Sequence, residues 1–274
     1  RSTNSTKVII SLCMKVIGLI GLVILLVSGC ATAPITGRSQ IKLVSDRALI
    51  SQSLTSYRKV ISEEKLSTNA EQTAMVQRVG NRISHAVERY LQREHMLHLI
   101  DGFQWEFNLI ENDTPNAWCM PGGKVAFYTG ILPYTHDEDG LAVVMGHEIA
   151  HAVVGHSAER VSHVLLQQGG GLLLSGYMKG KDNASAVMQL YGMGSQVGVI
   201  LPFSRTHELE ADHMGLIFMA MAGYDPQAAV GFWERMAAND AEKPPKFLST
   251  HPADDTRIRK IRKYMPEAMT YYQP

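Results

Sequence analysis

His147-Glu148-Ile149-Ala150-His151 is an H-E-x-x-H sequence inside a predicted helix, and the rest of the chain is interpreted around it. Residues four apart lie on one face of a helix, so both imidazoles can bind one metal ion while Glu148 lies near the ion's open position. The alternative is an ordinary helix whose histidines are simply hydrogen-bonded. We disfavour it because two histidines and a glutamate among Val, Met, Ile and Ala would be costly in a core without a function.

The helix that carries this motif is predicted independently of it. Thr135 can be the N-cap, and Glu138 can complete a capping box three residues later. Asp137, Glu138 and Asp139 place negative charge at the positive end of the helix dipole. Apolar residues then recur with helical spacing, which predicts that the helix continues to about Arg160 or beyond.

A catalytic zinc ion usually has three protein ligands and one open position, so the two histidines need a third partner. The metzincin pattern H-E-x-x-H-x-x-G-x-x-H would supply it from a third histidine. This sequence does not match that pattern, because positions 154 and 157 are valine and serine instead of glycine and histidine. We therefore expect a carboxylate from a second helix, predicted over about 205–222. Glu208 and Asp212 share one face of that helix. Glu208 is the predicted ligand, and Glu210, about 200° further round, should face elsewhere.

Asp212 is placed to accept a hydrogen bond from a ligand histidine, preferably His147, and so to fix its tautomer. His156 follows His151 by five residues and should point to another side of the helix. We treat His156, like the remaining histidines outside the motifs, as an ordinary core or surface residue.

The other elements follow from hydrophobic periodicity and turn residues. Two helices are expected over about 45–64 and 69–97, followed by a strand over 103–109. Short strands at 117–120 and 124–129 flank Pro121-Gly122-Gly123 and should form a hairpin. Further helices are expected from Asp225 as N-cap and from about Asp254. Helices, a small sheet and more helices together predict an α+β fold.

Residues 164–202 are apolar and rich in glycine, but polar residues interrupt every apolar run before it reaches the length of a membrane helix. We expect loosely packed helices over the site in preference to a span. The chain as a whole is 45% hydrophobic and 19% charged, an ordinary globular balance. Its formal net charge is zero, so no overall field would attract nucleic acid.

The H-E-x-x-H motif and the S-R-x-x-E-x-x-A-D sequence at 204–212 together resemble the HtpX-, BepA- and Oma-type gluzincin metallopeptidases. Further similar motifs are Asn116-Ala117, Pro121-Gly122-Gly123, Tyr128-Thr129-Gly130 and Thr250-His251-Pro252. The resemblance spans about 69–261. It implies a mainly helical zincin-like domain with one zinc ion on His147, His151 and Glu208, and a small sheet whose edge strand borders the active-site cleft.

The chemistry of such a site gives Glu148 the role of general base, taking a proton from the metal-bound water and passing it to the leaving amine. The resemblance makes His251 the best candidate for a second oxyanion donor, with a tyrosine, Arg257 and His207 as weaker candidates. It also implies that His251 can occupy the open zinc position in a resting, self-inhibited state. The alternative for His251 is a surface loop residue before a proline.

The resemblance also implies that substrates bind by strand addition along the hairpin edge, with Asn116, Ala117, Gly122 and Gly123 as candidate substrate-binding residues. Main-chain hydrogen bonds give affinity with little sequence selectivity. This suits an endopeptidase that removes misfolded or unassembled cell-envelope proteins. Two alternatives stay open: an envelope chaperone or assembly factor with a latent protease site, and a zinc hydrolase that acts on a non-peptide substrate.

Residues 1–29 differ from the rest of the chain in composition, because they are mostly apolar and carry no acidic side chain. Arg1, Lys7 and Lys15 are the only charges in 1–29, and the apolar run at 16–27 is too short for a membrane helix but typical of a signal peptide. The run ends in Val-Ser-Gly before Cys30, which resembles a bacterial lipobox. We expect a signal peptide at 1–29, a tether at 30–44 that is lipidated on Cys30, and the peptidase domain at 45–274. An uncleaved anchor from Val8 is the alternative, which Lys15 disfavours.

This interpretation predicts a lipid-anchored, periplasm-facing protein of the bacterial envelope. Resemblance to bacterial lipoproteins favours the outer membrane, because Ala31 after the cysteine carries no inner-membrane retention charge. Removal of 1–29 would leave 23 basic against 26 acidic residues, a net charge of −3. It would also leave Cys119 without an intrachain cysteine partner, so a disulfide framework is excluded.

Overall fold

The computed structural model describes residues 30–33, 36–179, 181, 185, 187–189, 201–238, 246–252 and 255–274. The expected signal peptide at 1–29 lies outside the described residues. So does most of 180–200, which is part of the loosely packed helices expected over 164–202.

The described elements alternate as the sequence predicts, with helices before and after a small sheet, and they confirm the mainly helical α+β class. In chain order they are β1 (Cys30–Thr32), β2 (Ser39–Ile41), α2 (Asp46–Glu63), α3 (Ala70–Arg93), η1 (Leu97–Ile100), β3 (Glu106–Ile110), β4 (Ala117–Met120), β5 (Lys124–Tyr128), η2 (Thr129–Ile131), α4 (Leu132–Thr135), α5 (Glu138–Val154), α6 (His156–Met178), α8 (Leu201–Met221), α9 (Ala228–Ala238), α10 (Lys246–Thr250) and α11 (Asp255–Met269).

The main sheet has the strand order β3-β5-β4. β5 pairs in parallel with β3 and antiparallel with β4, so β4 is an edge strand. The predicted hairpin between β4 and β5 is present. Gly122 and Gly123 turn the chain there with φ angles of 96° and 79°, a region that favours glycine.

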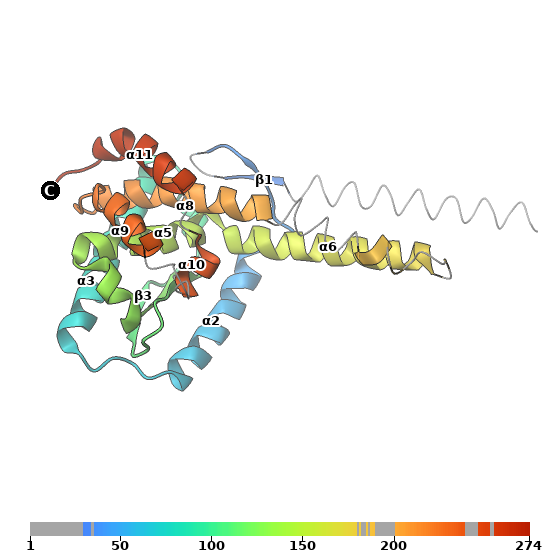
Figure 1. Cartoon of the computed structure of the whole chain (residues 1–274), viewed down its shortest axis with the longest axis horizontal. Coiled ribbons are helices and arrows are strands. Elements are labelled where there is room, and N and C mark those ends of the chain that lie inside the picture. The colour runs from blue at the N-terminus through green and yellow to red at the C-terminus, as the bar shows by residue number, and fades with distance from the viewer. Residues whose placement is uncertain are drawn as a thin grey trace, which may run out of the picture.

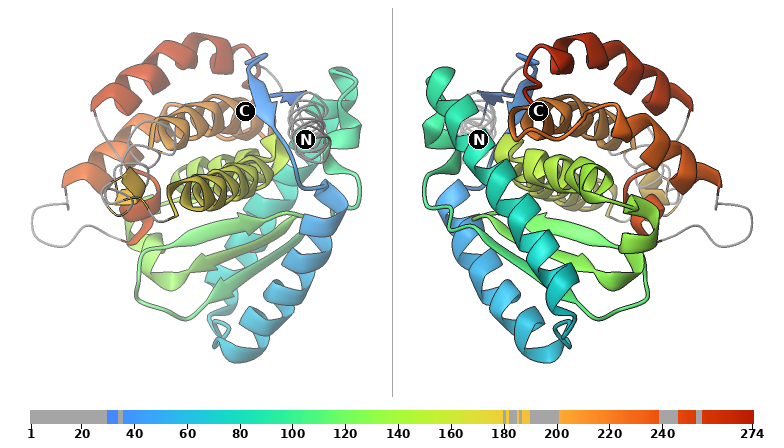
Figure 2. Two further views of the ribbon diagram at one scale, coloured as in Figure 1. Left: turned by 90° about the vertical axis from the view of Figure 1, so that its right-hand side faces the viewer. Right: turned by 90° about the vertical axis from the view of Figure 1, so that its left-hand side faces the viewer.

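The molecule is layered around the helix that bears the H-E-x-x-H motif. In Figure 2 the sheet, α5, α8 and α11 follow one another from bottom to top, and α5 packs against both β4 and α8. Every residue of α5 from Gly140 to Val154 is buried. This helix is therefore apolar on all sides except where its motif requires polar side chains.

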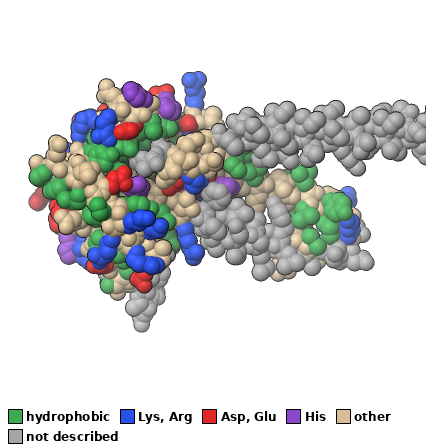
Figure 3. Space-filling view, turned by 90° about the horizontal axis from the view of Figure 1, so that it is seen from above, with side chains coloured by type: hydrophobic (Ala, Val, Ile, Leu, Met, Phe, Trp, Pro, Cys, Tyr) green, Lys and Arg blue, Asp and Glu red, His purple; other side chains and the backbone are tan. Residues whose placement is uncertain are grey.

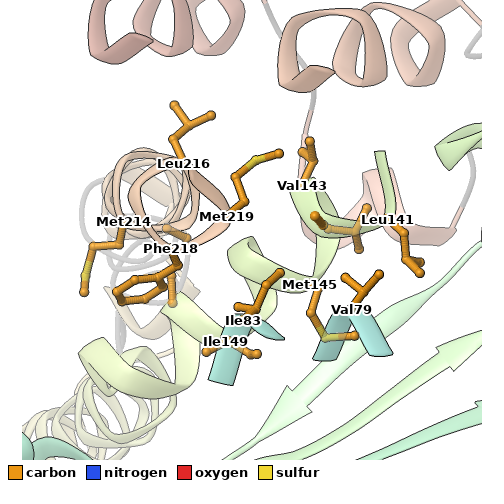
Figure 4. Close-up of a cluster of buried hydrophobic side chains, with 14 of the residues drawn as sticks. Val79, Ile83, Leu141, Val143, Met145, Ile149, Met214, Leu216, Phe218 and Met219 are labelled. Carbon is orange, nitrogen blue, oxygen red and sulfur yellow. The ribbon is translucent and has the colours of Figure 1, made fainter. Parts of the chain in front are cut away.

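A core cluster of apolar side chains joins α3, α5 and α8 (Figure 4). Val79 and Ile83 of α3 face Met145 and Ile149 of α5, and the side chain of Phe218 on α8 is also fully buried. This packing fixes α5, and with it the motif, against the helix that is expected to supply the third ligand.

Two glycines let α5 and α8 approach closely. A Cβ atom on Gly146 would lie 2.7 Å from the backbone oxygen of Gly215, and one on Gly215 would lie 2.9 Å from the backbone nitrogen of His147. Neither position has room for a side chain unless a helix moves. The two helices therefore cross with backbone against backbone, next to a motif histidine.

The boundaries of α5 correct two expectations. The N-cap is Asp137, whose carboxylate accepts a hydrogen bond from the amide of Gly140, and Thr135 instead ends α4. The helix also ends at Val154, because Gly155 adopts a left-handed conformation with φ of 80°. The predicted continuation to Arg160 is therefore a separate helix, α6.

The described part of the region expected to cover the site is mainly α6, which extends away from the body of the molecule (Figure 1). Leu172, Leu173 and Tyr177 near its outer end are 71–75% exposed, and hydrophobic side chains gather there (Figure 3). Within the residues that the structure describes, no helix combines the length and hydropathy that crossing a membrane requires.

Candidate metal centre

The predicted ligands from α5 and α8 meet where these helices cross. Nε2 of His147 and Nε2 of His151 lie 3.0 Å apart. The carboxylate of Glu208 lies 3.3 Å from His147 Nε2 and 3.4 Å from His151 Nε2. Two neighbouring turns of one helix and one turn of another thus place three donor groups around one point.

His251, at the end of α10, adds a fourth donor. Its Nδ1 atom lies 3.1 Å from His147 Nε2 and 2.9 Å from Glu208 Oε2. One ligand atom from each of these four buried residues lies within 4.8 Å of the others. His251 therefore belongs to the cluster, and the alternative of a surface loop residue is wrong.

This cluster fits a metal ion. Donor atoms at about 2.0–2.2 Å from a tetrahedral zinc ion are separated from one another by about 3.3 Å, close to the 3.0 Å between the nitrogens of His147 and His151. Oε1 of Glu148 is also buried and has no hydrogen-bond partner among the described residues, although His251 Nε2 lies 3.4 Å away. A buried carboxylate oxygen left in this way has room to bind a further polar group.

Asp212 occupies the predicted position behind His147. Its Oδ1 atom lies 3.0 Å from His147 Nδ1. Arg257 donates to both Asp212 oxygens, at 2.6 and 2.8 Å, and its guanidinium lies 3.5 Å from the ring centre of Trp233. Sequence reasoning considered Arg257 only as a weak candidate for an oxyanion donor, whereas the structure uses it to hold Asp212.

The charges at the centre follow from burial and from these pairs. Burial raises the pKa of Glu148 above its ordinary value. Burial also acts against ionisation of Asp212, but Arg257 beside it holds the pKa of that carboxyl below its usual range. The imidazoles and Arg257 around Glu208 outweigh burial in the same way and keep its pKa low. The lowered pKa values favour the ionised carboxylate form of Glu208 and Asp212. Of the three groups, Glu148 is the one that takes up a proton most readily.

His156 and Glu210 take part in the site although the sequence analysis set both aside. Nδ1 of His156 lies 2.7 Å from Nδ1 of His151, and its Nε2 lies 3.1 Å from Glu210 Oε2. Burial lowers the pKa of His156 to about 4, so its ring is neutral. The missed signal was Gly155, a helix-ending residue that starts a new helix and turns His156 back toward His151.

The candidate substrate-binding residues lie along the hairpin. The backbone oxygen of Asn116 accepts a hydrogen bond from Tyr128, and Ala117 begins the edge strand β4. The oxygen of the preceding Pro115 accepts a hydrogen bond from the amide of Phe247 in α10, which connects this strand to the helix that His251 directly follows. Gly122 and Gly123 lie at the other end of β4, near Ile50 and Trp105.

A pocket of about 710 Å³ adjoins the start of β4. Asp113, Pro115, Tyr134 and Arg235 contribute to its lining.

An H-E-x-x-H helix whose two imidazoles meet a carboxylate from a second helix defines a metallopeptidase. The chain belongs to peptidase family M48, whose family model matches residues 70–265. The match covers the sheet, the motif helix and all four donors of the cluster.

Curated relatives agree with this assignment. The chain is 42% identical over 190 residues to the mitochondrial metalloendopeptidase OMA1 of Schizosaccharomyces pombe, covering 66% of this chain and 53% of that protein. It is 29% identical over 245 residues to the human mitochondrial metalloendopeptidase OMA1, covering 86% and 46%. The beta-barrel assembly-enhancing protease of Escherichia coli is 33% identical over 167 residues, covering 58% and 34%. The chain thus spans about half the length, or less, of these relatives.

The expected bacterial-envelope location is wrong. The relatives from fission yeast, budding yeast, Arabidopsis thaliana and human are named as mitochondrial proteins, although the Escherichia coli relative is bacterial. The physical reason is that residues 1–29 are basic, acid-poor and partly apolar, and bacterial signal peptides and mitochondrial transit peptides share much of this composition. Lipidation of Cys30 was inferred from the bacterial interpretation and is untested.

Proposed function

We propose that this chain is a zinc-dependent endopeptidase in which Glu148 is the general base. The observation that carries the proposal is the buried Glu148 carboxylate, which lies beside a four-donor cluster with Oε1 left without a hydrogen bond among the described residues. Its raised pKa suits a group that accepts a proton and later releases it.

Zinc is the metal that we assign to the cluster. Imidazole nitrogens with one carboxylate are a ligand set that suits zinc, whereas calcium and magnesium prefer ligand sets made entirely of oxygen. When bound, the ion would polarise the scissile carbonyl and lower the pKa of a bound water. His147, His151 and Glu208 would hold it, while Glu148 would accept the proton of that water and deliver it to the leaving amine.

His251 is proposed to block the fourth coordination position at rest. Its Nδ1 atom is as close to His147 and Glu208 as the ligand atoms are to one another. An incoming substrate would then have to displace this ring. The proximity of His251 also supports the second candidate function, an assembly factor or chaperone whose protease site is latent.

The proposed substrates are misfolded or unassembled proteins presented as extended chains. Within the described part of the chain, β4 has a strand neighbour on one side only, and it packs against the motif helix. An extended polypeptide could pair with it through main-chain hydrogen bonds, which select little for sequence. The pocket beside Pro115 and Arg235 would receive a substrate side chain.

Replacing Glu148 by Gln tests the mechanism. We expect cleavage of casein by the zinc-loaded chain to fall by about 10²- to 10⁴-fold, because the amide cannot accept a proton. Zinc affinity should stay within about twofold, since Glu148 is not among the four clustered donors. Equal casein cleavage by the wild type and Glu148→Gln would contradict the mechanism.

Replacing His251 by Ala tests the resting state. If the ring blocks the open position, casein cleavage should rise several-fold and zinc should bind somewhat more weakly. His85→Ala, which changes an exposed histidine on α3, is the matched control and should change neither quantity. A fall in cleavage rate with unchanged zinc affinity would refute the block and favour His251 as a transition-state donor.

A further inference from the structure

The two metal-binding histidines are supported in different ways. His147 has the usual arrangement, with its Nδ1 atom 3.0 Å from the Asp212 carboxylate. Among the residues that the structure describes, no carboxylate is hydrogen-bonded to Nδ1 of His151. Its Nδ1 atom faces Nδ1 of His156 at 2.7 Å, and Nε2 of His156 faces Glu210 Oε2 at 3.1 Å. Support for His151 therefore runs through a second imidazole before it reaches a negative charge.

This chain of contacts determines which nitrogen carries each proton. The Glu210 carboxylate can only accept, so Nε2 of His156 must carry the proton that it donates. The two facing Nδ1 atoms of His156 and His151 lie 2.7 Å apart, so one donates and the other accepts. A His151 ring that binds a metal through Nε2 carries its proton on Nδ1, so Nδ1 of His156 is the acceptor. His151 must donate to it from its own Nδ1, and this leaves the Nε2 lone pair of His151 directed toward the metal cluster.

Residues far away in the sequence bind the Glu210 carboxylate and compensate its negative charge. Arg38, just before β2, donates from Nε and Nη2 to the two oxygens of Glu210, at 2.9 and 2.8 Å. Thr36 donates to the same carboxylate at 2.6 Å. The side chain of Glu210 is only 5% exposed, so its charge is compensated within the protein.

The same arginine also fixes the surroundings of His156. Arg38 donates to both oxygens of Glu159 on α6, at 2.7 and 2.8 Å. Glu159 lies 2.9 Å from Nε2 of His207, whose ring stacks on His156 with 4.2 Å between ring centres. Arg38 thus links α6 to α8 directly behind the ring that contacts His151.

We propose that residues 36–41, here called the N-terminal clamp, are a positioning element of the metal centre. Arg38 and Glu210 act through His156 to fix the tautomer and orientation of His151. The inference rests on the proposed zinc site, and it adds that metal affinity depends on a segment that lies outside the region matched by the family model.

The first test replaces Glu210 by Gln in the full chain. The side-chain amide can donate to His156 Nε2, which would reverse both tautomers and place a proton on the metal-facing nitrogen of His151. Zinc affinity, measured by competition with a chromophoric chelator, should fall by about 10- to 100-fold. Glu267→Gln is the matched control. The Glu267 carboxylate also pairs with a histidine of α8, His213, with 2.8 Å between Oε2 and Nε2, but Glu267 is half exposed and neither residue belongs to the cluster. This variant should leave zinc affinity unchanged.

The second test uses Arg38, whose side chain is 21% exposed and should tolerate substitution. Arg38→Lys keeps a positive charge but loses the bidentate contacts, so we expect a smaller loss of affinity than with Arg38→Met. If both residues act along one path, the Arg38→Met/Glu210→Gln double variant should bind zinc about as tightly as Glu210→Gln alone. Circular dichroism and thermal unfolding of each zinc-free variant identify any that fails to fold, and Arg38→Lys then stands in for it.

A spectroscopic measurement separates positioning from a merely structural role. Long-range proton–nitrogen correlation spectra of the histidine-labelled, zinc-loaded protein should show a protonated Nε2 on His156, and this signature should be lost in Glu210→Gln but kept in Glu267→Gln. Zinc affinity within twofold of wild type in Glu210→Gln or in both Arg38 variants would overturn the inference. Failure of the wild type to bind zinc would instead overturn the proposed function.

Discussion

Arg257 shows, at the scale of single residues, how a buried cation organises a metal site without binding the metal. It holds both oxygens of Asp212, lies 3.1 Å from Glu208 and packs on Trp233. Two carboxylates are thereby kept ionised in a buried environment, where an unpaired charge would be strongly disfavoured. Asp212 can then hold the proton of His147 on the nitrogen that faces away from the cluster.

Replacing Asp212 by Asn tests this arrangement. The neutral amide should accept more weakly from His147 and should leave Arg257 without its main partner, so zinc affinity should drop by about 10- to 100-fold. Asp255→Asn, an exposed carboxylate at the start of the helix that bears Arg257, is the control. Isothermal titration with a competing chelator gives both values, and equal affinities for the two variants would contradict the assigned role of Asp212.

The grouping of His147, His151 and Glu208 could be predicted because helix geometry is local. Residues four apart in one motif share a face whatever the rest of the chain does, and the same rule places Glu208 and Asp212 together. The angle between residues along one continuous helix predicted that His156 and Glu210 would face away from the metal ligands. That angle does not apply to His156, because Gly155 ends the helix between it and His151.

At the scale of elements, the site depends on how closely α5 and α8 cross. Gly146 and Gly215 place one backbone against the other beside His147. Close packing of this kind leaves no space for even one methyl group. The separation of the helices therefore sets the distance between the imidazoles and the Glu208 carboxylate.

Gly215→Ala should separate these helices. We expect a destabilisation of about 1–3 kcal/mol, typical of an overpacked core, together with weaker zinc binding. Gly176→Ala in α6 is the matched control, because a Cβ there meets nothing within 4 Å, and it should be neutral or stabilising by up to about 1 kcal/mol. Urea unfolding of the zinc-free chain measures both effects. Similar stabilities for the two variants would show that the crossing tolerates a side chain.

Element types could be predicted where periodicity and caps agree, but element ends could not. The helix expected to start at Pro226, with Asp225 as N-cap, begins two residues later at Ala228. The strand expected from Phe103 begins at Glu106. Both boundaries depend on which backbone groups find partners in the folded chain, and a sequence window does not contain that information.

At the scale of the whole molecule, Glu159 connects the N-terminal clamp to α6 and to α8. Burial acts against its ionisation, but Arg38 and His207 lower the pKa of Glu159 to about 2. Because this folded-state pKa lies below the ordinary value of 4.5, the stabilisation from Glu159 is complete above about pH 4.5. It is lost as the pH falls from there toward 2.

Glu159→Gln should reveal that loss. The free energy of unfolding of the wild type should exceed that of the variant by on the order of 2 kcal/mol at pH 7, and the difference should shrink as the pH approaches 2. Glu234→Gln, which removes an exposed partner of Arg262, should show a small difference that changes little with pH. Guanidinium unfolding at pH 7, 4 and 2.5 provides the comparison. A difference for Glu159→Gln that stays constant across these values would disprove the linkage.

Contacts between distant segments were the least predictable part of the molecule. Arg38 and Glu210 are 172 positions apart, and no local pattern marks either as a partner of the other. The prediction of the cellular location was wrong for a related reason, because the composition of the first residues of a chain is only loosely linked to the compartment that the protein reaches.

The single-sided pairing of β4 has a consequence for which proteins would be cut. A chain lying along that edge must offer several consecutive amides and carbonyls, and a natively folded protein keeps these groups engaged in its own helices and sheets. Susceptibility should therefore follow how often a segment opens in the target, and a well-folded protein would escape although it contains the same residues as one that is cut.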